Sequence, residues 1–505
     1  MKLNVSSILF AVFAWSLLLL RFGYQYGTGD QVELLPYVLY LHDNTLYPHD
    51  FFIQGLHAAQ PNERTVMAHL LLPFVNHLEV VCLLLQFLTT LTLVLGIEQL
   101  ALRFVKNKYT AWLIVLATLI PLNDFTLGNV ELYSECFQAS ALATAIIVWA
   151  INLFLDRKYT AASVLMSLAS IVQILDGLDV MLLMCFVMLV YVVQKKVSTK
   201  QFLSFVGIYA ATALVYMALI LKAKSGEGTL SNEETFTVLF QFRHPHHFIF
   251  ASFSKLKTIV FFALSVVGLV YFFKKSKPLF YMIAVGLLGV ITYAVITDVL
   301  HTIFIANFQF YKVTQWLKLL GVVAAFAYVE NNLGAYRQFV LPLWLERSKL
   351  VAGVAICFTV IICFADKLPY KVPYQLLGLK ERDDAVTICE AIKNNTPKDA
   401  VFVQPFDDTA LKFYAQRSSY VEFKANVRHK AYVGEWYKRI QQVFGISAND
   451  GSGFALRNVA NQSFCHADAA KLKALGVTHI LTTKDCGIAT GKLILQNNTY
   501  AVYQL

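Results

Sequence analysis

Acidic and histidine side chains follow the first apolar segment of the chain, within residues 23–52. The acidic and histidine side chains in this stretch are Asp30, Glu33, His42, Asp43, His49 and Asp50. The stretch contains no lysine or arginine. A carboxylate here can accept the proton of an attacking hydroxyl, which is the work of a general base. Asp30 also lies near the start of an expected helix, where an aspartate often caps the backbone, so both interpretations stay open.

Further candidate acids lie later in the chain. Glu131 and Glu135 lie in an expected second external loop, residues 123–137, whereas Asp176 and Asp179 lie inside nearly continuous apolar sequence. An ionisable group near membrane depth is costly, so the two aspartates are candidate functional residues. The two aspartates lie in residues 171–183, which we expect to be a short external loop. The alternative is that they only mark a tight turn, with Gly177 at the bend.

A cluster of basic and aromatic residues lies in "FQFRHPHHFIF", residues 240–250. Its polar side chains include Arg243, His244, His246 and His247. Histidines at this spacing can bind a metal ion. An arginine with neighbouring histidines also suits a phosphate group. We favour a cationic, aromatic collar at the membrane surface that faces a phosphate or is structural.

A second basic segment precedes a late apolar run. It includes Gln309 and Lys312, within residues 297–321. Lys312 can provide positive charge for a lipid phosphate. It can equally bury its aliphatic stem and extend its ammonium group to the membrane surface.

The composition places these residues in a membrane protein. The chain has 505 residues, of which 57% are hydrophobic and 15% charged, against about 25% charged in soluble domains. The net charge of +10 is spread in small clusters between apolar runs. This pattern is typical of topology signals and not of a nucleic-acid surface. We therefore expect a polytopic α-helical membrane protein with no nucleic-acid partner.

The apolar runs predict about eleven transmembrane helices, because a spanning helix needs about 20 residues. They lie near residues 5–22, 78–102, 109–122, 136–155, 159–175, 180–194, 202–221, 256–273, 279–297, 314–330 and 350–366. A re-entrant or interfacial segment is expected near 66–75. No signal-type cleavage site follows the first run, so we expect it to be retained.

Basic loops set the expected orientation. They are residues 103–108, 156–158, 195–200, 274–277 and 346–349. Such loops face the cytoplasm, so the N-terminus is expected inside. The first loop, residues 23–66, and everything after about residue 367 are then outside. The loop 222–255 is also external by alternation, although it carries several basic residues.

The last 130 or so residues predict a soluble α/β domain, because expected strands alternate with expected helices. The strands are 400–406, 418–424, 477–484 and 500–505, and the helices are 381–395, 434–445 and 467–476. Residues 449–458 are expected to be a loop. Of the three cysteines here, Cys465 and Cys486 are our choice for a disulfide. The domains are therefore residues 1–370 and 371–505.

Three short motifs resemble those of the GT-C-fold membrane glycosyltransferases. They are Gly29–Asp30 after the first span, "LYPHDFF" at residues 46–52 and "NFQFYK" at residues 307–312. The C-terminal domain resembles external domains of an uncharacterised bacterial branch of this group. The resemblance implies a polyprenyl-phosphate-linked sugar donor, a glycan or lipid acceptor, and a bacterial inner membrane with the C-terminal domain periplasmic.

The resemblance also implies roles for individual residues in a single inverting displacement. Asp30 would be the base, and Asp50 would orient the acceptor or help to hold a metal. A divalent Mg or Mn ion is the metal considered, although an Asp-x-Asp doublet is missing from the first loop. The substrate-binding residues would be Glu33, His49, Arg243, His244, His246, His247, Gln309 and Lys312. The alternatives are a non-catalytic membrane scaffold of the same fold and a lipid or solute transporter.

Overall fold

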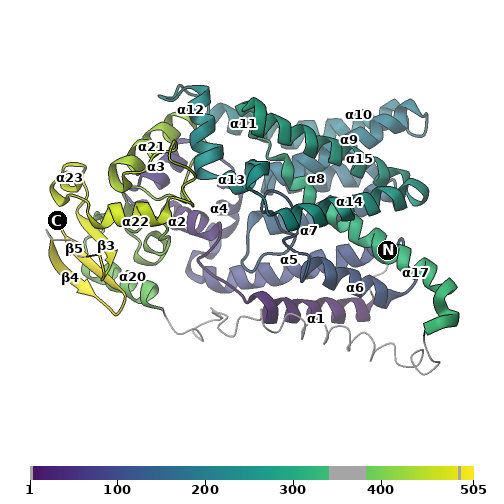
Figure 1. Ribbon diagram of the computed structural model, residues 1–505, viewed down its shortest axis with the longest axis horizontal. Helices are drawn as coiled ribbons and strands as arrows, with labels where there is room; N and C mark the ends of the chain where they lie inside the picture. Colours follow the sequence, from purple (N-terminus) through teal and green to yellow (C-terminus); the bar gives the residue numbers. More distant parts are fainter. Residues whose placement is uncertain (1–3, 341–382, 487–490) are drawn as a thin grey trace.

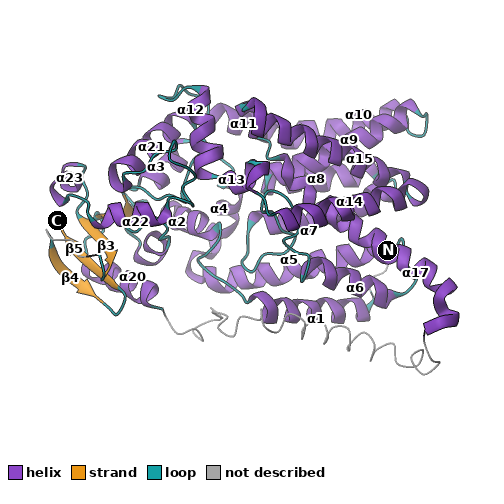
Figure 2. Cartoon of the chain, in the orientation of Figure 1, coloured by secondary structure: helices purple, strands orange, loops and turns teal. Residues whose placement is uncertain are grey.

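The computed structural model describes residues 4–340, 383–486 and 491–505. The chain forms a long helical bundle, and the described strands all belong to its C-terminal part (Figure 2). The N-terminus and the C-terminal sheet lie at opposite ends of the molecule (Figure 1). The predicted span at 350–366 and the predicted domain boundary near residue 370 lie outside the described residues.

The helical part runs to the end of α17. Its helices are α1 Val5–Phe22, α2 Gln31–His42, α3 Phe51–Ala58, α4 Thr65–Leu71, η1 Leu72–His77, α5 Leu78–Ala101, α6 Lys108–Leu119, α7 Ala139–Leu155, α8 Tyr159–Val172, α9 Ile174–Val193, α10 Thr199–Tyr209, η2 Ala210–Leu214, α11 Val215–Ala223, α12 Asn232–Phe236, η3 Thr237–Arg243, α13 Pro245–Phe248, η4 Phe250–Ser252, α14 Lys255–Lys275, α15 Lys277–Val295, η5 Ile296–Leu300, α16 Ile303–Ala306, η6 Phe310–Val313 and α17 Thr314–Val340.

Seven helical segments of the described chain are long and apolar enough to cross a membrane. They are Val5–Phe22, Thr65–Ala101, Ile174–Val193, Thr199–Ala223, Lys255–Lys275, Lys277–Leu300 and Ile303–Asn332. Helices α6, α7 and α8 are apolar but shorter. Large apolar side chains such as Val5, Leu221 and Phe304 are exposed on the bundle, as expected of a surface that lipid covers. The chain is therefore a multi-pass membrane protein.

Each predicted span within the described residues coincides with a helix, and capping residues explain several of the boundaries. The side chain of Asn4 accepts a hydrogen bond from the backbone N–H of Ser7, 2.9 Å away, at the start of α1. Ser198 and Gln201 form a capping box at the start of α10. Such contacts satisfy backbone N–H groups that have no partner inside the helix.

The region expected to be the external loop 171–183 is helical instead. Only Gln173 separates α8 from α9, so Asp176 and Asp179 lie within the first two turns of α9. Gly177 is not at a bend. A Cβ atom there would lie 2.1 Å from the Ser170 hydroxyl oxygen, so the glycine allows α8 and α9 to approach closely.

The long first loop is ordered and contains α2 and α3, and the expected interfacial segment near 66–75 is helical. It consists of α4 and the 3₁₀ turn η1, which lead directly into α5. Helix α2 packs against α4 and η1. The first loop therefore covers one end of the bundle as a small helical layer.

The C-terminal domain is a mixed α/β unit with a five-stranded sheet. Its elements are α20 Asp384–Asn395, β1 Val401–Val403, η8 Leu411–Ala415, β2 Ser418–Ser419, α21 Lys430–Phe444, α22 Arg457–Cys465, α23 Ala469–Ala474, β3 His479–Thr483, β4 Lys492–Gln496 and β5 Tyr500–Gln504. The strand order is β2-β1-β3-β5-β4. Strand β1 is parallel to β2 and β3, whereas β5 is antiparallel to β3 and β4.

Each predicted strand and helix of this domain coincides with a described element, although the predicted strand 418–424 is a strand only at Ser418–Ser419. Three described elements were not expected. They are η8, α22 and β4, and α22 begins inside the predicted loop 449–458. The expected disulfide between Cys465 and Cys486 is present.

A buried cluster of charges joins the first loop to the C-terminal domain. Asp50 and Glu422 lie 3.0 and 2.8 Å from the Lys412 ammonium, and all three side chains are buried. Asp50 also accepts a hydrogen bond from the backbone N–H of Ser419, 2.8 Å away. The Tyr47 hydroxyl donates to the Lys412 carbonyl at 2.9 Å. The "LYPHDFF" motif is therefore where the C-terminal domain contacts the first loop.

Candidate functional site

Asp30 lies at the first residue of a tightly fixed turn above the bundle. The Gln31 side chain accepts from the Gly27 N–H at 2.8 Å and donates to the Phe137 carbonyl at 3.0 Å. Gly29 has a φ of +56°, which favours glycine. The Asp30 side chain makes no capping hydrogen bond to α2 and is exposed. The turn therefore presents a carboxylate that the helix does not use.

Three cations from separate parts of the chain lie within electrostatic range of Asp30. They are Arg64, before α4, and Lys424 and Arg428, between β2 and α21. Burial lowers the pKa of each, and the Asp30 carboxylate acts in the opposite direction on all three. The Lys424 ammonium also donates to the Gly29 carbonyl at 2.5 Å. The C-terminal domain therefore brings positive charge to the Asp30 turn.

Arg428 differs from the other two cations in its partners. Arg64 forms ion pairs with Glu33 and with Glu63. Within the described residues, Arg428 forms no ion pair or hydrogen bond, and its guanidinium lies 5.3 Å from the centre of the Phe248 ring. An arginine with free donors can bind two oxygens of a phosphate group at once. Arg428 is therefore the strongest anion-binding candidate in the described part of the chain.

Arg243, a predicted phosphate contact, is only 4% exposed. Its guanidinium donates to the Lys424 carbonyl at 2.6 Å and lies 4.7 Å from the centre of the Phe423 ring. These contacts hold the loop that carries Lys424. Burial lowers the pKa of Arg243, but an arginine remains protonated at neutral pH, so it still adds to the positive potential there.

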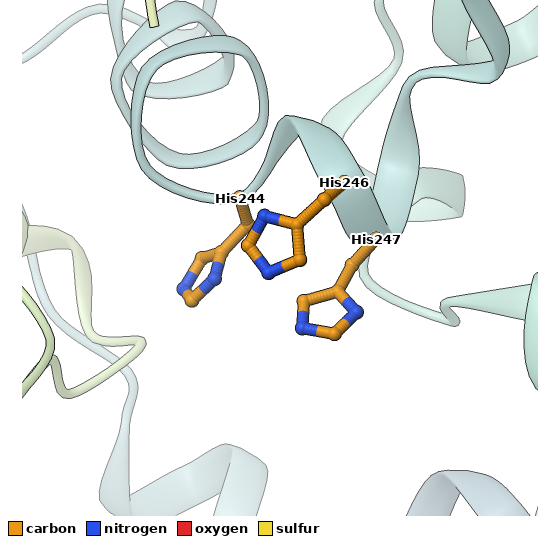
Figure 3. A group of neighbouring side chains, drawn as sticks. All are labelled: His244, His246 and His247. Atoms are coloured by element: carbon orange, nitrogen blue, oxygen red, sulfur yellow. The ribbon is translucent and has the colours of Figure 1, made fainter. Parts of the chain in front are cut away.

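The three neighbouring histidines converge, as Figure 3 shows. His244, His246 and His247 each offer a ring nitrogen within 4.8 Å of the others. Burial, aided by Arg243, lowers the pKa of His246 to about 4. Burial also lowers the pKa of His244 and of His247. The cluster is therefore neutral at pH 7, and the positive charge expected of a cationic collar comes from arginine and lysine instead.

The second predicted basic segment is buried in the bundle. Lys312 is 8% exposed and lies 3.1 Å from Asp176. Gln309 is buried at the start of η6. Asp179 is also buried, and neither of its carboxylate oxygens has a hydrogen-bond partner. Lys312 and Asp176 therefore neutralise each other below the surface that carries Asp30.

The remaining predicted acids do not form a common site with Asp30. Asp50 is fully buried, and its oxygens bind Lys412, the Ser419 N–H and the Ile53 N–H. Glu131 is exposed and Glu135 is half-buried in the segment between α6 and α7.

The structure also places two predicted substrate-binding residues of the first loop, Glu33 and His49. Glu33 is buried and paired with Arg64, so it borders the Asp30 turn. The His49 side chain is exposed, and its backbone N–H donates to the Ser418 hydroxyl at 3.2 Å. His49 thus belongs to the domain junction.

Magnesium or manganese does not fit the predicted pair of acids. These ions prefer several oxygen ligands at one place, whereas Asp50 is already neutralised by Lys412. In the described part of the chain, the residues grouped closely enough to hold a metal are the three histidines.

Sequence reasoning missed Arg64, Lys424 and Arg428. Lys424 and Arg428 belong to "YVEFKANVRHK", residues 420–430, whose first part was predicted only as the strand 418–424. The signal available was the concentration of four basic residues in an external segment that also contains Asn426. Only the fold shows that this segment lies against residues 27–31.

Comparison with known proteins adds little to these observations. Residues 383–443 match the model of a domain of unknown function, DUF6798. No curated protein matches the chain.

Two solved structures of an archaeal oligosaccharyltransferase from Archaeoglobus fulgidus show a weak likeness. In one, AglB is in complex with an inhibitory peptide and a dolichol-phosphate; the identity is 12% and the TM-score 0.45. In the other, the enzyme is tethered to an acceptor peptide by a disulfide bond; the identity is 13% and the TM-score 0.44. Both matches cover 95% of this chain and 69% of the other. With TM-scores below 0.5, they do not define a family for this chain.

Proposed function

We propose that the protein is a membrane glycosyltransferase that takes its sugar from a polyprenyl-phosphate donor. One observation carries the proposal: an exposed, uncapped carboxylate, Asp30, faces cations that arrive from distant parts of the chain. A sugar transfer from a lipid phosphate needs both halves, a base for the acceptor and positive charge for the leaving group.

The reaction is a single displacement at the anomeric carbon. Asp30 takes the proton of the acceptor hydroxyl, whose oxygen forms a bond to that carbon. The bond from the anomeric carbon to the phosphate oxygen breaks, and the phosphate keeps the electron pair. Arg428 and Lys424 stabilise the negative charge that develops on the phosphate. Attack from the side opposite the leaving group inverts the anomeric configuration.

The helical bundle would hold the polyprenyl tail, and the acceptor would be a glycan or a lipid. The membrane is proposed to be a bacterial inner membrane, with the N-terminus cytoplasmic and the C-terminal domain outside. The Cys465–Cys486 disulfide supports this orientation, because disulfides persist in oxidising compartments. The placement of the N-terminus and the sheet domain at opposite ends of the bundle agrees with it.

The test compares Asp30→Asn with Asp43→Asn, a matched change in the same loop. Asp43 lies at the C-terminal end of α2, where it accepts hydrogen bonds from Thr45 and lies 3.9 Å from the exposed Lys398 ammonium. Transfer of radiolabelled sugar is measured from a panel of polyprenyl-phosphate sugars. Loss of a general base should lower the rate by about 10²- to 10⁴-fold in Asp30→Asn, and Asp43→Asn should stay close to the unchanged protein. Equal rates for the two variants would remove Asp30 as the base.

Binding of the donor is tested separately with a fluorescent short-chain polyprenyl phosphate. Arg428→Gln should weaken binding by about tenfold or more, since a charge-assisted hydrogen bond contributes about 1.5 to 3 kcal/mol. Lys430→Gln is the matched control, because its ammonium binds Asn232 on an exposed surface. If both variants bind the lipid like the unchanged protein, Arg428 does not bind the phosphate.

A second candidate is a non-catalytic scaffold, and the buried Asp50–Lys412–Glu422 cluster favours it. This cluster uses the second predicted acid to fix the external domain on the bundle. A scaffold would depend on that cluster and not on Asp30. The same Asp30→Asn experiment separates the two functions when it is read together with the ability of the variant to support growth or envelope assembly.

A further inference from the structure

A cluster of three histidines lies next to Arg243, close to the cations of the proposed transferase site. The segment between α11 and α14 contains the short helix α13, which begins at Pro245. Its sequence places histidines at residues 244, 246 and 247, on the last residue before the helix and on its first turn. Figure 3 shows the three rings turned toward a common space.

The distances suit one ion with small side-chain adjustments. The three ring nitrogens lie within 4.8 Å of one another. Three ligands at about 2.0 to 2.1 Å from a tetrahedral metal lie about 3.4 Å apart, so the nitrogens have to approach one another by about 1.4 Å at most. The rings of His246 and His247 are already close, with their centres 4.1 Å apart.

The hydrogen bonds leave ligand nitrogens free. The Nδ1 atom of His247 lies 2.7 Å from the Gly128 carbonyl, which can only accept, so Nδ1 carries the proton. The lone pair on Nε2 is then available, which is the arrangement that commonly orients a metal-binding histidine. His244 lies 3.4 Å from the Arg243 guanidinium, which is longer than an ordinary hydrogen bond. Among the described residues, His246 makes only ring contacts, including one with Phe454 at 4.9 Å.

The donor set selects the class of metal. Three imidazoles suit zinc, copper, nickel or iron, whereas magnesium and manganese prefer oxygen ligands. A three-histidine set also leaves a fourth position open.

The charges around the three histidines predict how tightly they bind a metal ion. Arg243 and Arg428 both act on His244, and no carboxylate belongs to the cluster. A bare dication is therefore repelled by its surroundings, and an anion in the open position should strengthen binding.

We propose that His244, His246 and His247 together bind one zinc-class transition-metal ion, with the fourth position open to an anion. This site is independent of the base role of Asp30, and it is tested with the metal alone.

The experiment uses the full-length protein in detergent, purified through a tag without histidine. The protein is equilibrated with chelator-buffered zinc and then dialysed, and the bound metal is counted by mass spectrometry. We expect about one zinc per chain, and about tenfold or greater loss of affinity in His246→Asn and in His247→Asn. His466→Asn, an exposed histidine of the external domain, is the matched control and should bind like the unchanged protein.

Two further measurements use the unchanged protein, so they do not depend on whether a variant folds. X-ray absorption of the zinc-loaded protein should show imidazole nitrogens at about 2.0 Å. Cobalt in place of zinc should give the visible absorption of a four-coordinate site, and added chloride or inorganic phosphate should change that spectrum. A zinc content far below one per chain, a spectrum dominated by oxygen ligands, or equal affinity in His246→Asn and His466→Asn would overturn the proposal.

Discussion

Replacement of Lys412 by methionine tests the junction between the first loop and the C-terminal domain. Methionine keeps an unbranched side chain of similar length and removes only the charge. The change leaves the carboxylates of Asp50 and Glu422 buried without their cation, since Lys412 is the residue that lies 3.0 and 2.8 Å from them. We expect the external domain to be destabilised on the bundle.

The magnitude follows from the burial of all three groups. Removal of one partner from a buried ion pair costs about 3 to 5 kcal/mol. At roughly 2 to 4 °C per kcal/mol, the apparent Tm should fall by roughly 6 to 20 °C. Protonation of a buried carboxylate that has lost its cation restores part of the stability of the protein. The loss of stability in Lys412→Met should therefore depend on pH.

The sign of the pH dependence follows from Glu422. Burial raises the pKa of Glu422, and Lys412 opposes that rise. Without Lys412 the pKa of Glu422 in the folded state rises further above its unfolded value of about 4.3. The folded variant then binds a proton that the unfolded chain does not, so its stability increases as the pH falls through the raised pKa. The deficit relative to the unchanged protein should therefore be largest at pH 8 and smaller near pH 5.

The assay is thermal unfolding in detergent, followed by tryptophan fluorescence, because Trp436 donates a hydrogen bond to the Glu422 carbonyl. Lys438→Met is the matched control, since its ammonium is exposed and lies 3.7 Å from Glu435. Glu422→Gln in the Lys412→Met background should restore part of the stability. If Lys412→Met and Lys438→Met unfold at the same temperature, the buried cluster does not hold the domains together.

Two further outcomes are expected from the site and from the external domain. Gly29→Ala forces a residue with a side chain into a left-handed conformation, at a cost of about 1 to 2 kcal/mol, and places a Cβ atom 2.9 Å from the Gln138 amide. The rate of sugar transfer should therefore fall. Gly207→Ala, whose Cβ atom meets no neighbour, should leave the rate unchanged. Cys465→Ser should lower the stability of the C-terminal domain by about 3 kcal/mol, because the bond to Cys486 closes a loop of 21 residues. In chemical unfolding, a reductant should destabilise the unchanged protein by a similar amount and should have no effect on the variant.

Much of the fold could be predicted from the sequence because the signals are local. Apolar runs long enough to span a membrane became helices, and alternating patterns in the last part of the chain became β1, β3 and β5. The two aspartates of α9 were placed in a loop because they interrupt an apolar run. Gly177 was taken as a bend, although it is a packing position against Ser170.

The site could be predicted only in part, because its contacts join distant segments. Asp30 was found from its place after the first span, and Arg243 from its aromatic neighbours. Arg428 was missed because its position depends on how the external domain docks. The ion pair between Asp50 and Lys412 has no local signal either, although an aspartate before a helix is an ordinary capping residue.

The hydrogen bond from Lys424 to Gly29 has a consequence for the timing of biosynthesis. The two residues are 395 positions apart, and a ribosome adds about 5 to 20 residues per second. The turn that holds Asp30 therefore exists for about 20 to 80 s before its lysine partner is made. During that interval the nascent chain carries the acid without the cations of the C-terminal domain, so the charge arrangement around Asp30 is completed only after that domain has been synthesised.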